Sequence, residues 1–463
     1  MNTIDDLFHK IIDEKYGFGT GVWPVVNSNL EMKFNEVGEY IPVIKNAQKK
    51  FSDDEIRNLK ETNLFFSTKN VSDIADELFS DVPNIHFNPK IGYYTSLYAG
   101  HVSEKEYRLN ASSGGFGTWI LSELLEKNYV DHVIHVKESN EDGKLFQYTI
   151  SKNVDEINQG AKTKYYPVEL SGVLEYVKKN SGKYAIIGLP SFIMELRLLS
   201  QIDQVINNRI KICVGLVCGH QKSKLFGDFL AWQCGVMPDE LIGINFRKKL
   251  DNEQSNTYAV EVKGIVEGKE ITISKKMKDL YGGDWGQGFF KLRASDFTDD
   301  VMNETADITL GDAWLPEYTK DSQGNNIVVV RNPIIDKIIK KGIEDNRLKL
   351  DIISEEKIIQ SQSAHYRHTQ DELSYRIDKK DKNKEWRPQV RINNKEKIPL
   401  IRKKIQDNRE WICLEAPIVF LETVKKNDFN LFVSSMEPVL KKYRYLYRIE
   451  NLKNKIFKKL KIK

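Results

Sequence analysis

The sequence lacks the features of a membrane-spanning or a disulfide-rich protein. Its 463 residues contain no apolar run near the roughly 18 to 20 residues that cross a bilayer, and the opening segment MNTIDDLFHKIIDEKYG is too acidic for a signal peptide. Cysteine is scarce and never occurs in Cys-x-x-Cys spacing. The four cysteines are Cys213, Cys218, Cys234 and Cys413. We therefore expect reduced thiols in a cytoplasmic protein.

Negative charge is nearly absent from the end of the chain. The formal net charge is +4, yet Lys441 to Lys463 alone carry ten Lys and Arg against one Glu, so the remainder is mildly acidic. This basic tail mixes Tyr, Leu, Ile and Phe with its cations, which suits either an anionic membrane surface at the inner face of the membrane or an acidic partner. A solvated helical end is the alternative. No nucleic-acid recognition motif accompanies the charge, so nucleic acid is not an expected partner.

The pattern of apolar runs predicts an α/β core with additions at both ends. Residues 1–84 have few periodic segments and predict a small, loop-rich cap with a hairpin and a polar helix. From Ile85, short apolar runs alternate with amphipathic helical segments, which indicates parallel crossovers. Residues 242–333 are rich in β-type stretches and predict an α+β portion packed on the first. Beyond Pro333 come helical segments, a charged linker and the basic tail.

The strongest local signal is NASSGGFGTWILSELLEKN, residues 110–128. Ser112 and Ser113 can cap a helix, while Gly114 and Gly115 let the backbone approach a ligand closely. Free backbone N–H groups and the positive end of a helix dipole at this turn predict a phosphate site. A plain serine cap after a glycine turn is the alternative.

Two further segments place polar groups after strands. YAIIGLPSFIMELRLL puts Gly188, Pro190 and Ser191 at the carboxyl end of a strand, where ligands bind in open α/β sheets. KICVGLVCGHQKSK repeats this arrangement with Cys218 and His220. Cys218 is more typical of a buried small hydrophobe than of a nucleophile, and His220 has no acidic partner at useful spacing.

Other polar residues leave the chemistry open. Lys162 and Lys164 in GAKTKYYPV can neutralise a phosphate or can lie on the surface, and Asp312 in GDAW can face the same cleft or cap a turn. His365 and His368 share a helix face, which we expect to be solvated because no carboxylate completes a metal site. The sequence assigns no catalytic acid or base and no metal ligand.

Taken in order, these motifs resemble the coenzyme F420 hydrogenase/dehydrogenase beta-subunit family. The resemblance runs from about residue 85 to 333 and rests on ASSGGFGTWILSELLEKNYVDHVI, KTKYYPVE, YAIIGLPSFIMELR, CVGLVCGH and FFKLRASDFTDDVMNETADITLGDAWLPEY followed by GNNIVVVRNP. It implies a redox protein that binds FAD and usually carries iron–sulfur clusters. The implied parts are a degenerate ferredoxin-like cap (1–84), an N-terminal flavin-binding part (85–175), a C-terminal part (176–335) and a helical extension with a basic tail (336–463).

The resemblance also implies where FAD binds. The Ser-Gly-Gly turn, the Lys-Tyr segment and an upstream arginine are the inherited flavin positions, and the lysine and strand-end residues above complete the expected cofactor site. These residues are Arg108, Ser112, Ser113, Gly114, Gly115, Lys162, Lys164, Tyr165, Gly188 and Pro190.

This sequence departs from the family pattern at the positions of the cluster ligands. Hydroxyl, glycine or tryptophan residues stand where relatives have thiolates, in the core and in the cap. In the core these residues are Ser191, Ser295 and Thr298, and in the cap they are Gly17, Thr20 and Trp23. An iron–sulfur cluster needs about four thiolates. We therefore predict that no cluster binds.

Together these features predict a cluster-free, FAD-dependent oxidoreductase. A soluble hydride donor would reduce the flavin, which would then reduce a small organic substrate. The alternative is a non-redox descendant that binds a nucleotide-sugar or acts as a transferase or scaffold in glycan assembly. Cluster-lacking members of the family resemble proteins of bacterial surface-polysaccharide gene sets, which gives either activity a setting in polysaccharide biosynthesis.

Overall fold

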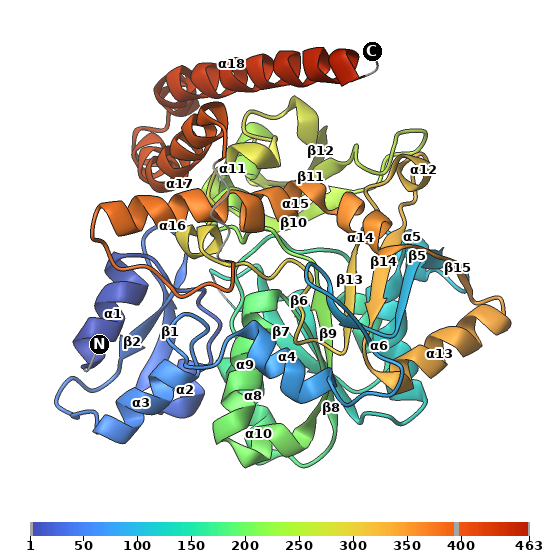
Figure 1. The fold of residues 1–463 in the computed structure, drawn as a ribbon. Coiled ribbons are helices and arrows are strands. Elements are labelled where there is room, and N and C mark those ends of the chain that lie inside the picture. Colours follow the sequence, from blue (N-terminus) through green and yellow to red (C-terminus); the bar gives the residue numbers. More distant parts are fainter. Residues whose placement is uncertain (1–2, 142, 393–397, 462–463) are drawn as a thin grey trace.

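A central mixed sheet organises the computed structural model, which describes residues 3–141, 143–392 and 398–461, with side chains up to residue 456 (Figure 1). The eight strands follow the order β15-β5-β14-β13-β9-β8-β6-β7. They are β5 (Ser96–Val102), β6 (His132–Glu138), β7 (Phe146–Ser151), β8 (Tyr184–Gly188), β9 (Ile210–Leu216), β13 (Ile308–Asp312), β14 (Asn326–Val330) and β15 (Leu348–Ile352). The central neighbours β6, β8, β9 and β13 pair in parallel, and the outer strands pair antiparallel. The prediction of a mixed α/β core with parallel crossovers is therefore confirmed.

Helices cover both faces of this sheet because its central strands are apolar on both sides. On one face, α6 (Phe116–Glu126) and α13 (Pro333–Glu344) pack around Trp119, which is fully buried. On the other face lie α8 (Ser171–Lys179), α9 (Pro190–Ile202) and α10 (Gln204–Arg209). The alternation is visible in β6, where Val133 belongs to the first core and the next residue, Ile134, to the second.

The β-rich stretch at residues 242–333 is divided between two sheets. Only β10 (Leu241–Lys248), β11 (Ala259–Val266) and β12 (Lys269–Lys276) form a separate antiparallel sheet, whereas β13 and β14 lie inside the central sheet. The difference follows from side-chain polarity: Ile308 to Leu310 of β13 are all buried, while β12 is mostly exposed. The three-stranded sheet packs on α11 (Leu225–Gln233).

The amino-terminal cap contains the predicted hairpin, β1 (Leu30–Phe34) with β2 (Tyr40–Ile44), and the predicted polar helix α3 (Asp53–Glu61). It also includes α1 (Ile4–Phe8), a π-helical turn (His9–Asp13), α2 (Trp23–Val26) and α4 (Val71–Phe79). Its core is completed by residues distant in sequence, because Tyr16 and Trp23 belong to one cluster with Phe297 and Leu373. The cap is thereby joined to the rest of the fold.

Short elements connect these parts. They are β3 (His86–Asn88), β4 (Gly92–Tyr94), α5 (Tyr107–Asn110), α7 (Val154–Gln159), α12 (Pro316–Thr319), α14 (Glu355–Ser361), α15 (Ser363–Tyr366), a second π-helical turn η6 (Arg367–Asp371), and 3-10 turns at Pro238–Glu240, Met277–Asp279, Trp285–Gln287 and Arg293–Asp296. The last of these, η5, lies in the loop where the resemblance places cluster ligands.

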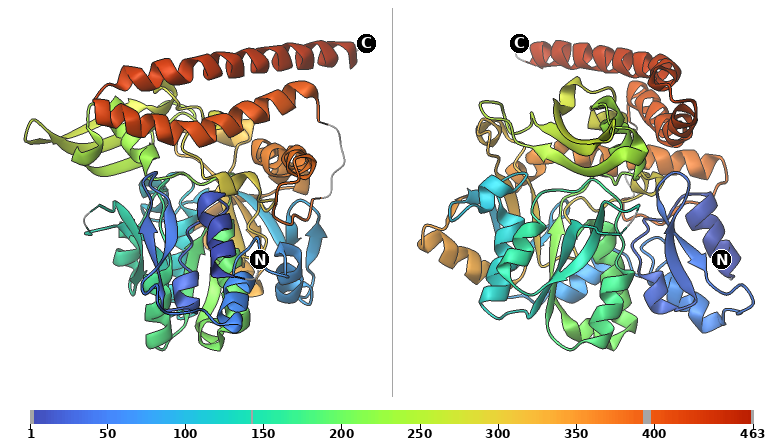
Figure 2. Two further views of the ribbon diagram at one scale, coloured as in Figure 1. Left: turned by 90° about the vertical axis from the view of Figure 1, so that its left-hand side faces the viewer. Right: turned by 180° about the vertical axis from the view of Figure 1, so that it is seen from behind.

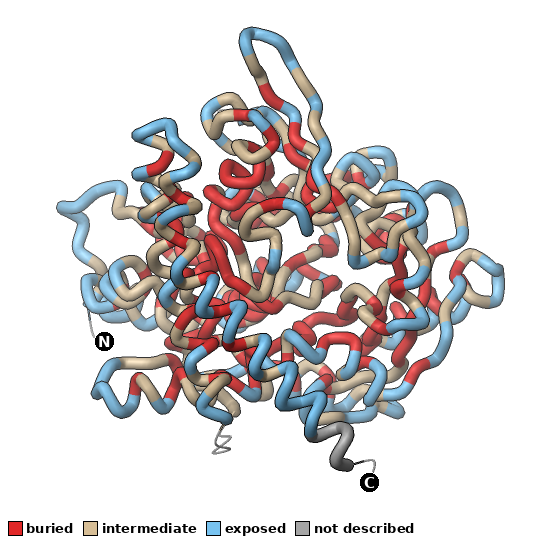
Figure 3. The backbone as a smooth tube through the Cα atoms, turned by 90° about the horizontal axis from the view of Figure 1, so that it is seen from above, coloured by how far each residue is buried: buried red, intermediate tan, exposed pale blue. Residues whose placement is uncertain are grey.

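The helical extension consists of α16 (Leu373–Lys382), α17 (Leu400–Lys426) and α18 (Phe429–Lys461). α17 and α18 form a hairpin at the edge of the molecule, next to the three-stranded sheet (Figure 2). Residues 393–397 of the charged linker and residues 462–463 of the basic tail lie outside the described residues. No described helix is long and apolar enough to span a bilayer. Seen from above, buried segments concentrate in the interior, and α18 leads outward from it (Figure 3).

Candidate functional site

A cavity of about 300 Å³ opens at the carboxyl ends of the parallel strands. Gly188 at the end of β8, Cys218 just after β9 and Asp312 at the end of β13 line one side. The beginning of α6 and residues 162–166 line the other. Both the size and the position are typical of small-molecule sites in open α/β sheets.

Helix α6 begins at this cavity with a glycine at its N-cap. Gly115 has a left-handed φ of 89° and no side chain to cap the helix, and the first helical N–H, that of Phe116, donates to Asn326 Oδ1 at 3.3 Å. A Cβ at Gly115 would lie 2.8 Å from backbone atoms of Tyr107 and Arg108, so the close turn requires glycine. Gly117 and Thr118 line the cavity. The positive end of the helix dipole therefore faces the cavity.

The prediction that Ser112 or Ser113 caps α6 is wrong, because both hydroxyl groups hold the turn from other directions. Ser113 Oγ donates to the carbonyl of Asn325 at 2.9 Å, and the backbone N–H of Thr163 donates to Ser112 Oγ at 2.9 Å. The second contact ties the glycine turn to the lysine-rich segment. Both predicted cofactor segments thus meet in one wall of the cavity.

Two half-buried lysine side chains, Lys164 and Lys249, hold this wall from behind. Lys164 Nζ donates to the carbonyls of Ala161 at 2.7 Å and Lys162 at 3.0 Å, and Lys249 Nζ donates to the carbonyl of Ser113 at 3.0 Å. Burial lowers the pKa of Lys164 to about 7 and that of Lys249 to about 7. Lysine side chains near this turn are therefore poised to gain charge when an anion arrives.

An ion pair at the end of β13 forms another part of the wall. Arg247, from β10, contacts Asp312 at 2.6 Å and lies between the rings of Tyr258 and Trp314, 5.0 Å and 5.4 Å from their centroids. Although burial opposes its charge, Asp312 raises the pKa of Arg247. Arg247 Nε is buried and has no hydrogen-bond partner among the described residues. Asp312 lines the cavity, so of the two interpretations of GDAW, a cleft-facing Asp and a turn-capping Asp, the structure supports the first.

The segment after β9 supplies neutral groups. Burial, together with the charge of Lys222 and Lys291, lowers the pKa of His220 well below its usual range, so its ring is neutral at pH 7. His220 Nε2 is buried without a hydrogen-bond partner in the described part of the chain. Burial raises the pKa of Cys218 to about 12, which keeps it a thiol. Such a thiol is a poor nucleophile or metal ligand.

Most of the predicted cofactor residues converge on the cavity, and three do not line it. Arg108 pairs with Asp321 at 2.5 Å, Gly114 packs against Asn326 and Gly100, and Pro190 begins α9. Those that line it are Ser112, Ser113, Gly115, Lys162, Lys164, Tyr165 and Gly188.

Sequence reasoning missed several residues of the wall. Arg247, Gln221 and Asn326 come from elements whose neighbours are set by sheet pairing, so no local pattern identifies them. His135 had a usable signal, since a histidine inside an apolar strand is expected to be buried for a reason. It lines the cavity, and its Nε2 lies 2.7 Å from Ser151 Oγ.

The core positions where the family resemblance expects thiolates carry hydroxyl side chains, and two of these side chains accept hydrogen bonds. Gln221 connects two of them: its Nε2 donates to Ser191 Oγ at 2.7 Å, and its backbone N–H donates to Ser295 Oγ at 3.1 Å. Both serines are buried, and Thr298 is half-buried. Among the described residues, no group of three His, Cys, Asp or Glu side chains is arranged to hold a metal ion.

The corresponding positions of the cap also have partners within the protein. Thr20 Oγ donates to the buried carboxyl group of Glu195, and Trp23 Nε1 donates to the carbonyl of Leu59 at 2.9 Å. A Cβ at Gly17 would lie 2.6 Å from Ile11 Cγ2, so a cysteine there requires Ile11 to move.

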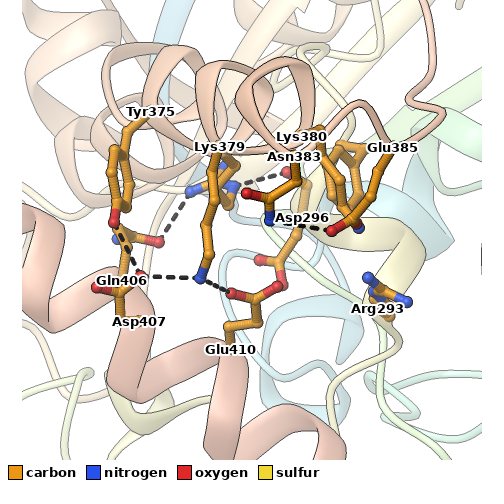
Figure 4. Close-up of a pocket in the computed structure, with 12 residues that line it drawn as sticks. Arg293, Asp296, Tyr375, Lys379, Lys380, Asn383, Glu385, Gln406, Asp407 and Glu410 are labelled. Atoms are coloured by element: carbon orange, nitrogen blue, oxygen red, sulfur yellow. Dashed lines mark hydrogen bonds and ion pairs between the residues drawn. The ribbon is translucent and has the colours of Figure 1, made fainter.

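A second pocket, of about 170 Å³, lies between the η5 turn and helices α16 and α17 (Figure 4). Several of its polar groups pair with one another: Lys379 contacts Asp407 at 3.0 Å and Glu410 at 2.6 Å, and Arg376 donates to Gln406 at 2.8 Å. This pocket is a polar joint between elements.

The expectation that His365 and His368 form a solvated face is wrong. His368 is 4% exposed and lies 3.2 Å from a carboxylate oxygen of Asp296, and His365 packs against Gly219. The segment that carries both histidines packs against the core and against α16, which bury this helix face.

The sequence and the fold were compared with those of known proteins. Two family models, which describe the N-terminal and the C-terminal parts of the coenzyme F420 hydrogenase/dehydrogenase beta subunit, match residues 97–175 and 181–356 respectively. An uncharacterised protein of Methanocaldococcus jannaschii is 25% identical over 264 residues, which cover 55% of this chain and 89% of that protein.

Among solved structures, a chain of the F420-reducing nickel–iron hydrogenase complex from Methanosarcina barkeri aligns with a TM-score of 0.48 and 14% identity, over 64% of this chain and 96% of its own. The two family models together match more than half of the residues, in the order that the sequence motifs predicted. This chain therefore belongs to the coenzyme F420 hydrogenase/dehydrogenase beta-subunit family.

Proposed function

We propose that this protein is a flavin-dependent oxidoreductase that binds FAD in the cavity at the strand ends and works without an iron–sulfur cluster. The observation that carries the proposal is that one cavity contains both a helix start with a glycine N-cap and buried polar atoms that lack protein partners among the described residues. A cofactor with phosphate groups and a polar ring system could bind to both: the phosphate groups at the helix start and the ring at the unpartnered polar atoms.

The start of α6 and the neighbouring lysines fit the phosphate groups. The N–H groups at Gly117 and Thr118 belong to a first helical turn, where backbone donors are free to bind anions. Lys162 lines the same wall and supplies positive charge. Lys164 and Lys249 hold the backbone of the two wall segments through their carbonyl contacts.

The opposite wall fits a polar ring. Arg247 Nε and His220 Nε2 are buried groups for which a cofactor would supply hydrogen-bond partners, and an unsatisfied buried polar group otherwise costs roughly 1 to 3 kcal/mol. Tyr165 contributes an aromatic side chain to the lining. The neutral state of His220 leaves one ring nitrogen free to accept a hydrogen bond.

Flavin supplies hydride transfer when bound, while the protein controls binding and electrostatics. The hydroxyl and glycine positions described above support a cluster-free enzyme, because they leave Cys218 as the one cysteine of the ligand set that the resemblance expects, and a cluster needs about four thiolates. Electrons would then pass as hydride between a soluble donor and a small organic substrate that use the same cavity. A role in surface-polysaccharide assembly remains part of this proposal.

Two measurements on the purified protein test it. A visible absorption spectrum reports flavin, and an iron assay reports a cluster. We expect a flavin band, or FAD binding in a titration, without iron. If FAD does not bind and nucleotide-sugars instead raise the melting temperature, the non-redox glycan alternative replaces this proposal.

A matched pair of glycine substitutions tests the site itself. Gly117 and Gly172 are each the second residue of a helix, α6 and α8. A Cβ at Gly117 would lie 3.6 Å from Ile187 and 3.8 Å from Leu310, both in the cavity lining, whereas one at Gly172 meets nothing within 4 Å. We expect Gly117→Leu to weaken FAD binding by about tenfold or more, because its side chain occupies cavity space. Gly172→Leu should leave the affinity unchanged, and equal affinities for both variants contradict the assigned site.

A further inference from the structure

Helix α18 carries an apolar stripe on the side that faces away from the protein. Its members are large side chains that a monomer rarely leaves in a row on its surface. They are Tyr445, Ile449, Leu452 and Ile456, with exposed fractions of 63%, 39%, 61% and 58%. α18 forms the outer edge of the molecule in both views of Figure 2, and the exposed fractions show that the described residues leave this stripe uncovered.

The spacing of the stripe is regular. At about 100° per residue, the steps of four, three and four residues keep all four side chains within about 60° of one another, along about 16 Å of helix. The buried face of α18 is on the other side, where Tyr443 and Leu446 pack against Ile405 of α17. Helix α18 therefore has two apolar faces, and its packing against α17 buries only one of them.

Cations flank the outward stripe on both sides. By the same helical geometry, Lys441, Arg448 and Lys455 lie along one side, and Lys442 and Lys453 lie along the other. The single acid between residues 441 and 456 is Glu450. It lies on the inner side and pairs with Arg402 at 2.9 Å. The outward face is consequently apolar along its centre and positive along both borders.

This charge pattern indicates which kind of partner can cover the stripe. In a pair of α18 helices from two copies, Lys and Arg would meet Lys and Arg along both borders of the seam, and like charges there are unfavourable. A partner surface that is apolar enough to bury the stripe and carries negative charges on both sides of it would match both the apolar side chains and the flanking cations. Lysine and arginine side chains are long enough to reach such charges while their stems cover the ridge.

We propose that α18 docks on an anionic phospholipid membrane, with Tyr445, Ile449, Leu452 and Ile456 in the interfacial region and the flanking cations on the headgroups. Interfacial helices bury an apolar face at the level of the headgroups and add electrostatic attraction to acidic lipids. The inference is independent of the proposed cofactor, because it uses no residue of the cavity.

Flotation of the full-length protein with vesicles tests this surface. The probes are vesicles of phosphatidylcholine alone and of phosphatidylcholine with phosphatidylserine. We expect binding to the second kind, little binding to the first, and a decline in binding as salt is raised. Equal binding to both kinds overturns the role of the cations. Absence of binding to either, including the case in which the protein dimerises through α18 or captures only an acidic protein, overturns the proposal.

Variants separate the stripe from general surface hydrophobicity. Ile456→Glu should reduce vesicle binding by about tenfold or more, since a buried isoleucine contributes a large share of the apolar attraction. Ile352→Glu is the matched control, because Ile352 is 85% exposed on β15, outside helices α16 to α18, and the substitution should leave binding unchanged. Arg448→Gln and Lys455→Gln should each reduce binding about fivefold. Circular dichroism confirms that each variant is folded, and a loss of binding in Ile352→Glu equal to that in Ile456→Glu refutes the docking surface.

Discussion

The carboxyl group of Glu195 gives a quantitative test of how the cap is held. Glu195 lies in α9 and is 3% exposed. It accepts hydrogen bonds from Thr20 Oγ, from Asn63 Nδ2 at 3.0 Å and from the backbone N–H of Leu64 at 3.3 Å. Burial outweighs these donors and raises the pKa of Glu195 from 4.5 to about 7. The carboxyl group therefore enters the folded protein in its neutral form at mildly acidic pH.

The sign of the pH dependence follows from this raised pKa. Below pH 4.5 the carboxyl group is protonated in both the folded and the unfolded state, so its titration does not change the free energy of unfolding. Between pH 4.5 and about 7 the unfolded chain releases the proton while the folded protein keeps it, so the free energy of unfolding falls as pH rises. At about 1.4 kcal/mol for each tenfold change in proton affinity, the total loss by pH 8 is about 3 kcal/mol.

Glu195→Gln should remove this loss. Glutamine has the same shape, and its carbonyl oxygen can accept from Asn63 and Leu64 while its amide donates to Thr20 Oγ. We expect the variant to equal the natural protein at pH 4.5 and to exceed it by up to about 3 kcal/mol at pH 8. Urea unfolding followed by tryptophan fluorescence measures both, since Trp23 reports on the cap core.

The difference between the two proteins isolates Glu195 from other groups that titrate in the same range. Glu126→Gln, at an exposed position of α6, controls for the loss of one negative charge and should give parallel stability curves. If Glu195→Gln also gives a curve parallel to the natural one, or is less stable at pH 8, the carboxyl group is ionised in the folded protein and the reasoning fails.

Two further substitutions test polar joints elsewhere. Asp312→Ala leaves Arg247 buried without its carboxylate, and we expect a loss of about 3 kcal/mol or more in the free energy of unfolding together with weaker FAD binding. Gln221→Leu leaves the hydroxyl of Ser191 without its donor and should cost about 1 to 2 kcal/mol, of which Ser191→Ala in the same chain should restore most. Urea unfolding measures the free energy of unfolding of each variant. If the losses caused by Gln221→Leu and Ser191→Ala simply add in the double variant, the two side chains do not form a hydrogen bond that stabilises the fold.

The sequence predicted those features that depend on local pattern. Hydrophobic runs and their spacing identified the parallel strands, the cap hairpin and the polar helix α3. The family resemblance implied that the Ser-Gly-Gly turn and the lysine segment share one site, and the hydrogen bond from the Thr163 N–H to Ser112 Oγ joins these two segments. The motifs also identified the family. Local pattern failed where contact is set by pairing over long distances: β13 and β14 entered the central sheet, and Arg247 reached the cavity from β10.

The serine cap failed for a related reason. A Ser before a helix is a good capping signal only if no distant group competes for its hydroxyl. Here Asn325 and the backbone of Thr163 do compete, and Gly115 ends the turn instead. The histidines of the extension were misjudged because burial of that helix depends on how the chain folds back, which periodicity does not report.

The loop at η5, where the family resemblance places cluster ligands, is held in its shape by contacts that need no cluster. Phe297 packs edge-on against Tyr16 of the cap, with ring centroids 5.1 Å apart. The backbone carbonyl of Asp296 accepts from Arg376 Nε at 2.7 Å, and its carboxylate pairs with the buried Lys291. The loop therefore joins the cap to α16 of the extension through contacts that involve no thiolate.

Burying such charges is costly unless each has its partner, so selection can preserve this joint for folding alone. In the cluster-free enzyme that we propose, hydroxyl groups at the positions where the resemblance expects thiolates would therefore cost the fold little stability. The same reasoning separates the two predicted properties of this protein: the retained loop indicates a structural constraint, whereas a retained cavity with unpartnered buried groups indicates a ligand.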